Sequence, residues 1–290
     1  MKAIFSFKCF SDVASLNKIR FYNYARLAVA SASRFYKTHL YCCKKSKHLI
    51  TKQWGIKFDE VTVLDELTDY KGDMYCYPKI LAMMKETEPY VHLDFDTYIT
   101  APLYSDNVVK FGHAEVYNSK EKMRSSSLNY LNENYFIPHN TIFNKILDKS
   151  FTDSFDWNTI PNNSAVIVNN PDIVKTIYKK IILDTDDIIH SESKTAHLCQ
   201  YVEQFLLCKY LEYYNIDFDF IYHLNPILFT EEGKIKHSRV KKIYINDELM
   251  IDLLDGLKFV HFHGYRTHPV ATMFIDKIYK TKFDNAKKLY

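Results

Sequence analysis

The first hundred residues alternate between short apolar runs and longer segments whose apolar residues recur at helical spacing. Four runs are typical of strands: 2–7, 38–43, 59–64 and 89–95. Three segments are typical of helices: 20–36, 45–55 (ending at Gly55) and 77–88 (with Pro78 in its first turn). This succession predicts an α/β fold with a Rossmann-like N-terminal half, in which a mostly parallel central sheet carries helices on both faces.

The pattern is less regular after residue 103. Residues 164–187 predict a strand, a turn at 169–171 and a helix. Other strand-like segments are 111–118, 217–221, 241–245 and 257–264. Other helix-like segments are 138–150, 195–215 and the chain from about Val270. The polar segment 119–135 predicts a loop.

The composition is that of an ordinary globular protein, with 47% apolar and 25% charged residues. A net charge of +3 is too small to indicate a nucleic-acid partner. The basic segments 233–242 and 274–290 predict solvated surface, with weak peripheral contact to anionic lipid as the alternative. Six cysteines without a C-x-x-C pair, and no signal-peptide or membrane-spanning pattern, predict a cytoplasmic protein.

The run YVHLDFDTYIT (90–100) places Asp94 and Asp96 at the carboxyl end of the fourth predicted strand. In an extended chain these side chains point one way while Phe95 returns to the core. Open α/β sheets bind ligands at this edge, and two close carboxylates repel each other unless a cation lies between them. The segment therefore predicts a metal or phosphate site, with a carboxylate-capped turn as the alternative.

The stretch YPKILAMMKETEPYVHLDFDTYITAPL resembles the nucleotide-sugar half of GT-A fold glycosyltransferases. Glycosyltransferase family eight and an uncharacterised group of similar proteins are the most alike. Three later segments resemble the same template in the same order: PNNSAVIVNN (161–170), YVEQFLLCKYL (201–211) and KFVHFHGYRTHP (258–269). The resemblance implies one GT-A-like domain, 1–290, with a nucleotide-sugar half at 1–103 and an acceptor half at 104–290.

The resemblance also implies a metal site. Asp94, Asp96 and His261 would hold Mn²⁺ or Mg²⁺, with His263 as the alternative histidine. A nitrogen ligand favours Mn²⁺ over Mg²⁺.

The resemblance also implies which residues contact the nucleotide-sugar donor around that metal. The nucleotide-binding set is Lys79, Asp94, Asn163, Gly264 and Arg266, and the catalytic pair near the anomeric carbon is Glu203 and Gln204. Lys79 could instead be a solvated helix lysine, and Glu203 one polar position on an apolar helix. Two positions depart from the family: Ala165 replaces a glycine, and Thr267 replaces a phosphate-binding lysine whose charge Arg266 or His268 would have to supply.

The implied activity is transfer of a hexose from a UDP- or GDP-linked donor to a glycan or other acceptor, and the likeness to family eight favours retention. A haloacid-dehalogenase-like phosphatase with Asp94 as nucleophile is one alternative. It is disfavoured because the motif follows three strand–helix units and the second acidic pair, Asp186–Asp187, follows a helix. The other alternative is a GT-A-like domain that binds a nucleotide sugar or a partner without catalysis. It stays open because Ala165 and Thr267 depart from the family pattern.

Overall fold

The structure is a computed structural model of the 290-residue chain. It describes residues 1–10, 21–72, 74–116, 159–190, 199, 201–222, 227–229, 235–237, 256–262 and 275–284. The predicted loop 119–135, the helix 138–150 and the strand 241–245 lie outside the described residues.

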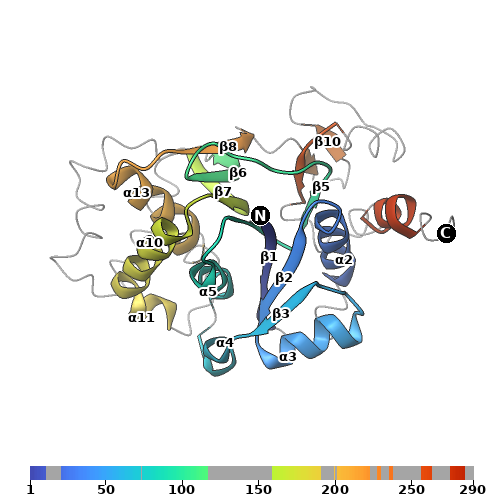
Figure 1. Ribbon diagram of the computed structural model, residues 1–290, viewed down its shortest axis with the longest axis horizontal. Coiled ribbons are helices and arrows are strands. Elements are labelled where there is room, and N and C mark those ends of the chain that lie inside the picture. Colours follow the sequence, from blue (N-terminus) through green and yellow to red (C-terminus); the bar gives the residue numbers. More distant parts are fainter. Residues whose placement is uncertain are drawn as a thin grey trace.

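A seven-stranded sheet forms the centre of the molecule, in the order β3-β2-β1-β4-β7-β6-β8 (Figure 1). Its strands are β1 (Lys2–Phe7), β2 (Lys37–Cys42), β3 (Glu60–Val63), β4 (Tyr90–Leu93), β6 (Val109–Val116), β7 (Thr159–Val168) and β8 (Phe218–Tyr222). Within this sheet, β7 runs antiparallel to β4 and β6, and the other neighbours are parallel. The sheet is therefore mixed but mostly parallel, as predicted.

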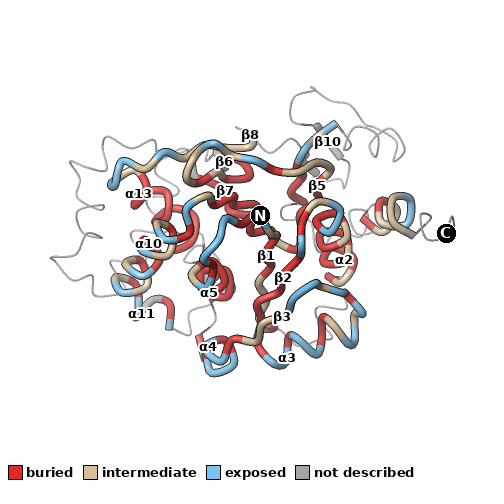
Figure 2. The backbone as a smooth tube through the Cα atoms, in the orientation of Figure 1, coloured by how far each residue is buried: buried red, intermediate tan, exposed pale blue. Residues whose placement is uncertain are grey.

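Helices cover both faces of the sheet, which confirms the predicted α/β class. Strand β1 alternates, with Ile4 in one buried cluster and Ala3 and Phe5 in another. Helix α2 (Phe21–Ala32) packs on the Phe5 face. The helices on the Ile4 face are α5 (Tyr77–Lys85), α10 (Pro171–Asp184) and α13 (Leu206–Tyr213). Figure 2 shows their buried sides facing the sheet.

Two predicted helices contain π-helical turns. The segment 45–55 is α3 (Lys44–Lys47) followed by η1 (His48–Gln53), and Gly55 ends it with a positive φ of 66°. The segment 195–215 contains η3 (Tyr201–Phe205), which leads directly into α13. Single π-helical turns are frequent at functional sites, and η3 carries Glu203 and Gln204.

Shorter elements complete the described chain. They are α4 (Asp65–Asp69), α11 (Asp186–Ile189), the antiparallel pair β9 (Ile227–Phe229) and β10 (Ile235–His237), and a C-terminal helix that ends as η4 (Lys280–Asp284).

The segment that carries the two aspartates is a turn rather than a strand. Strand β4 ends at Leu93, and residues 94–96 turn into β5 (Thr97–Ile99). Strand β5 pairs antiparallel with β11 (Phe259–His261), so that His261 lies opposite Thr97. The expectation of an extended Asp-Phe-Asp segment is wrong, because the chain turns there and leaves the central sheet to form this second ladder.

Phe95 fastens that turn to the core. Its ring stacks on Phe5 with 5.3 Å between ring centroids, and it meets Phe7 and Phe21 edge-on. Only 5% of Phe95 is exposed. The predicted return of this side chain to the core is thus confirmed, although the backbone around it is not extended.

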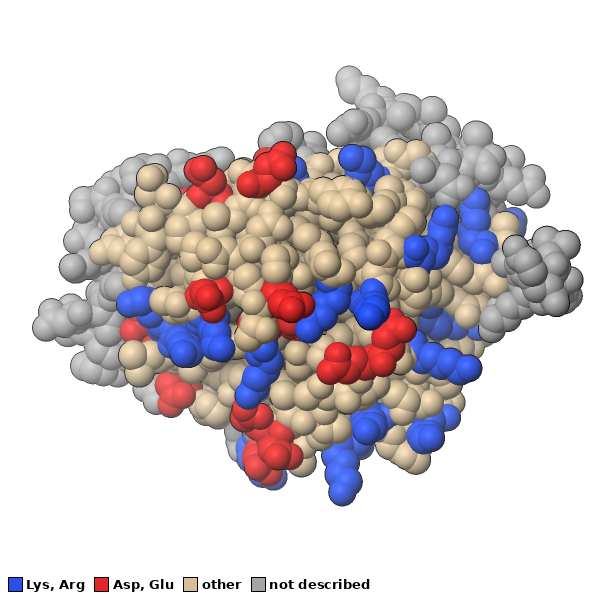
Figure 3. Space-filling model, in the orientation of Figure 1, with Lys and Arg blue, Asp and Glu red and all other residues tan. Residues whose placement is uncertain are grey.

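None of the helices that the structure describes combines the length and apolar character needed to cross a bilayer. On the face drawn in Figure 3, acidic and basic side chains of the described residues are interspersed.

Replacing Phe95 with alanine tests whether the turn depends on this aromatic cluster. We expect Phe95→Ala to lower the free energy of unfolding by about 3–5 kcal/mol, because a buried aromatic side chain is lost and leaves a cavity. Urea denaturation measures the change. The matched control is Tyr104→Ala, since Tyr104 is 73% exposed. Equal stability of the two variants would contradict the packing role.

Candidate functional site

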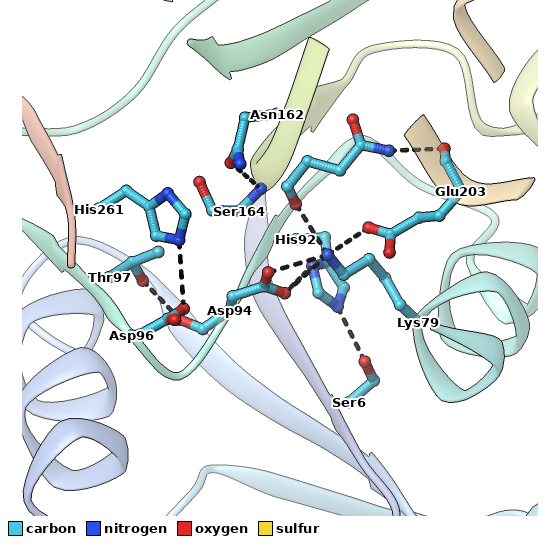
Figure 4. A network of polar contacts seen from close by, with 11 residues as sticks. Ser6, Lys79, His92, Asp94, Asp96, Thr97, Asn162, Ser164, Glu203 and His261 are labelled. Atoms are coloured by element: carbon cyan, nitrogen blue, oxygen red, sulfur yellow. Dashed lines mark hydrogen bonds and ion pairs between the residues drawn. The ribbon is translucent and has the colours of Figure 1, made fainter. Parts of the chain in front are cut away.

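A buried lysine connects three of the predicted site segments. Lys79 lies on α5 with 7% of its surface exposed. Its Nζ lies 2.8 Å from Asp94 Oδ1 and 2.5 Å from Glu203 Oε1, and it donates to the backbone oxygen of Asn163 at 3.0 Å (Figure 4). The structure therefore excludes the solvated-lysine interpretation and gathers Asp94, Asn163 and Glu203 around one ammonium group.

This arrangement follows from the strand order. Strand β7 lies between β4 and β6, and its residue Ala165 pairs with Leu93 at the end of β4. The backbone N–H of Asp94 then donates to the oxygen of Ser164 at 2.8 Å. Asn163 is thereby brought beside the aspartate turn from more than sixty residues away in sequence.

The charged groups of this cluster shift one another's pKa values. Burial alone would lower the pKa of Lys79, but the Asp94 and Glu203 carboxylates reverse this and raise it above its ordinary value. Burial raises the pKa of Asp94, Lys79 opposes that shift and Asp96 adds to it. The pKa of Asp94 thus remains above its ordinary value, while the Lys79 ammonium stays charged between the two carboxylates.

The π-helical turn η3 is fixed to strand β7 by a side-chain hydrogen bond. Asn163 Nδ2 donates to the backbone oxygen of Glu203 at 2.8 Å. Asn163 Oδ1 and Gln204 Oε1 are buried and accept no hydrogen bond from the described residues. Buried polar atoms of this kind are normally satisfied, so both oxygens are suited to accept from hydroxyl groups of a ligand.

Asp96 turns toward a different partner. Its Oδ1 lies 3.6 Å from His261 Nε2, and both side chains are 4% exposed. The backbone oxygen of Asp96 accepts from the N–H of Phe262 at 2.9 Å, which ties the turn to the end of β11. The predicted metal histidine thus lies beside the second aspartate, held there by the β5–β11 ladder.

A buried histidine lies beneath the aspartate turn. His92 Nε2 is 3.0 Å from Ser6 Oγ, and its Nδ1 is 3.8 Å from Asp94 Oδ1. Burial lowers the pKa of His92, and the Lys79 ammonium lowers it further. We therefore expect His92 to be a neutral part of the floor of the site.

The side chains of Asp94, Asp96 and His261 suit a divalent cation only in part. Two carboxylates and an imidazole are an appropriate ligand set for Mn²⁺. However, no group of three or more metal-binding side chains is assembled within the described parts of the chain. Asp96 and His261 face each other, whereas Asp94 is bound by Lys79. Asp96 and His261 would therefore be the two direct ligands of a cation. Asp94 would be a third ligand whose charge is shared with Lys79.

The other residues predicted for the site either lie outside the described residues or lie on the surface. His263, Gly264 and Arg266 lie outside the described residues, as do Thr267 and His268. Asp186, from the acidic pair considered for a phosphatase, is on the short helix α11 with its side chain 65% exposed and paired with His190.

Sequence reasoning missed three polar residues of the site: Ser6, His92 and His113. The histidine at 92 was visible within the same apolar run as the aspartates, where a buried titratable residue is itself a signal. His113 gave no signal, since its partner His261 is 148 residues away.

Residues 16–154 match a protein-family model described as a family of unknown function, DUF6734. No curated protein matches the chain.

Solved structures of glycosyltransferases resemble the chain over nearly its whole length. The galactosyltransferase LgtC, in complex with donor and acceptor sugar analogues, has 9% identity and a TM-score of 0.41, covering 99% of this chain and 100% of that one. Mouse xyloside xylosyltransferase 1, in its apo form, has 13% identity and a TM-score of 0.42, covering 91% of this chain and 97% of that one. Both are glycosyltransferases, the class of enzyme that the sequence motifs resemble.

Replacing Lys79 tests the buried charge cluster. We expect Lys79→Met to lower the free energy of unfolding by about 3–5 kcal/mol at neutral pH, because the buried carboxylates of Asp94 and Glu203 both lose the ammonium group. Without the ammonium the pKa of Asp94 rises further. As the pH falls through that raised pKa the carboxyl group becomes neutral, so the difference from the wild type should shrink in acid.

Urea denaturation at several pH values measures this effect. The control is Lys85→Met on the same helix, whose ion pair with Glu66 is about half exposed and worth at most about 1 kcal/mol. A Lys79→Met variant as stable as Lys85→Met, or one that loses stability in acid relative to the wild type, would contradict the cluster.

Proposed function

We propose that this protein is a metal-dependent glycosyltransferase that moves a hexose from a UDP- or GDP-linked donor to a glycan or other acceptor. The observation that carries the proposal is the convergence on Lys79 of Asp94, Asn163 and Glu203. These residues belong to three segments that resemble the GT-A template separately. Chance similarity would not require their side chains and backbone to meet at one ammonium group.

Lys79 and Asp94 serve the donor side of this reaction. The bond between the sugar and the diphosphate breaks, and its electron pair leaves with the diphosphate oxygen. The buried ammonium of Lys79 contributes positive potential toward that developing charge, in a setting where water does not screen it. Gly264 and Arg266 remain predicted nucleotide contacts.

Glu203 and its neighbours serve the sugar. The Glu203 carboxylate lies 2.5 Å from Lys79 Nζ, and its negative charge stabilises the positive charge that develops at the anomeric carbon. Asn163 Oδ1 and Gln204 Oε1 accept hydrogen bonds from sugar hydroxyl groups. The acceptor hydroxyl attacks the anomeric carbon, and its proton passes to the departing diphosphate oxygen. The likeness to family eight favours retention.

Asp96 and His261 would hold the cation, with Asp94 as the shared third ligand. When bound, Mn²⁺ or Mg²⁺ supplies a Lewis acid for the diphosphate. The nitrogen of His261 favours Mn²⁺. His263 stays the alternative ligand of the prediction.

The test is incubation of the purified protein with Mn²⁺ and a panel of UDP- and GDP-sugars, followed by measurement of released nucleoside diphosphate. The proposal is supported if Glu203→Gln lowers the release of nucleoside diphosphate and Asp106→Asn does not. Asp106 is the control because it is an exposed carboxylate outside the site. Donor binding without release would overturn catalysis in favour of a binding domain. Phosphate release from a monoester substrate would overturn it in favour of a phosphatase.

Asp96→Asn separates metal-dependent donor binding from folding. We expect wild-type protein to gain about 2.7 kcal/mol of stability when UDP or GDP with Mn²⁺ is present at a hundred times its Kd. The variant should lose this gain because an amide does not supply the charge of a metal ligand, while its melting temperature without ligand stays close to that of the wild type. Thermal-shift measurement compares the two. An unchanged shift in Asp96→Asn would contradict the assignment of Asp96 to the metal.

A further inference from the structure

A second histidine lies directly behind His261. His113 Nε2 is 3.1 Å from His261 Nδ1, and the two rings lie 5.3 Å apart with 34° between their planes. On its other side, His113 Nδ1 is 3.1 Å from the backbone oxygen of Ala114. His113 is 2% exposed, so this chain of contacts is buried.

The backbone carbonyl of Ala114 determines the direction of the hydrogen bonds that link it to His113 and His113 to His261. A carbonyl oxygen only accepts, so His113 Nδ1 must carry a hydrogen and donate it. In a neutral His113 the Nε2 atom is then an acceptor. It accepts from His261 Nδ1–H, which leaves the neutral His261 ring with its lone pair on Nε2. That nitrogen faces Asp96 Oδ1 at 3.6 Å.

We propose that His113 is a positioning residue that fixes the tautomer of His261, so that His261 presents Nε2 as a ligand beside Asp96. The inference rests on the proposed metal site. A metal-binding histidine commonly donates its other ring N–H to a partner that sets its orientation. Here that partner is a neutral imidazole, and the Ala114 carbonyl is the group that sets the imidazole in turn.

The backbone places His113 for this role. The register of β6 against β7 shifts between Phe111 and His113, and a shift of this kind re-aims the following side chain. A Cβ at Gly112 would lie 2.9 Å from the ring of Phe259, the residue two positions before His261 on β11. The absence of a side chain at Gly112 therefore lets β11 approach β6 closely enough for the two histidines to meet.

The tautomer of His261 can be measured without metal, donor or activity. Long-range ¹H–¹⁵N correlation spectra of ¹⁵N-histidine-labelled protein, at mildly alkaline pH, report which ring nitrogen carries the hydrogen. We expect Nδ1–H for both His113 and His261 in the wild type. A His261 ring with its hydrogen on Nε2 would overturn the inference while leaving the transferase proposal untouched.

Variants at position 113 test the consequence for the metal. His113→Phe keeps a ring of similar size but offers no acceptor, and we expect Mn²⁺ affinity to fall about 10–100-fold. His113→Gln restores an acceptor through its amide oxygen and should recover most of the affinity. His48→Phe, at an exposed histidine, is the control and should bind Mn²⁺ as the wild type does.

Titration with Mn²⁺ alone, followed by electron paramagnetic resonance of the free ion, gives these affinities. Wild-type affinity in His113→Phe, or equal losses in His113→Phe and His113→Gln, would overturn the positioning role. Wild-type protein that binds no Mn²⁺ would overturn the metal site itself, and with it both proposals. Failure of the inference alone leaves Mn²⁺ binding by the wild type intact.

Discussion

The buried ammonium of Lys79 is the contact on which the candidate site depends. An uncompensated charge inside a protein is costly, so Lys79 requires the carboxylates of Asp94 and Glu203 as much as they require it. Each comes from a different element: α5, the turn after β4, and the π-helical turn η3. Satisfying one buried cation thereby fixes three segments relative to one another, and the resulting constraint extends to Asn163 through its backbone oxygen.

The second half of the site is brought in by a separate short ladder. Strand β5 continues from the aspartate turn, pairs with β11 and so places His261 next to Asp96. The two aspartates consequently have different partners, a lysine for Asp94 and a histidine for Asp96. This division accounts for a site that contains metal-binding side chains and yet shows no assembled group of three of them within the described residues. Charge on Asp94 has to be shared between Lys79 and any cation.

Much of this could be predicted from the sequence because it depends on local pattern and on motif order. The strand–helix succession gave the sheet and its covered faces, and Phe95 was correctly placed in the core. The sequence offered a turn at the two aspartates only as an alternative, because the choice depends on the pairing of β5 with a strand about 160 residues later. Whether Lys79 is buried could not be predicted for the same reason. A lysine on a helix is buried only when the fold places oppositely charged partners from distant segments beside it. His113 depends on a shift in strand register, which leaves no mark in the pattern of apolar residues.

The central claim is that the edge of the sheet at Asp96 and His261 holds a divalent cation next to the Lys79 cluster. Anomalous X-ray diffraction from crystals grown with Mn²⁺ and UDP or GDP tests it most directly. We expect a manganese peak within direct bonding distance of Asp96 and His261 Nε2, with the nucleotide diphosphate beside it. Manganese bound elsewhere, or a nucleotide bound at this edge without manganese, would contradict it.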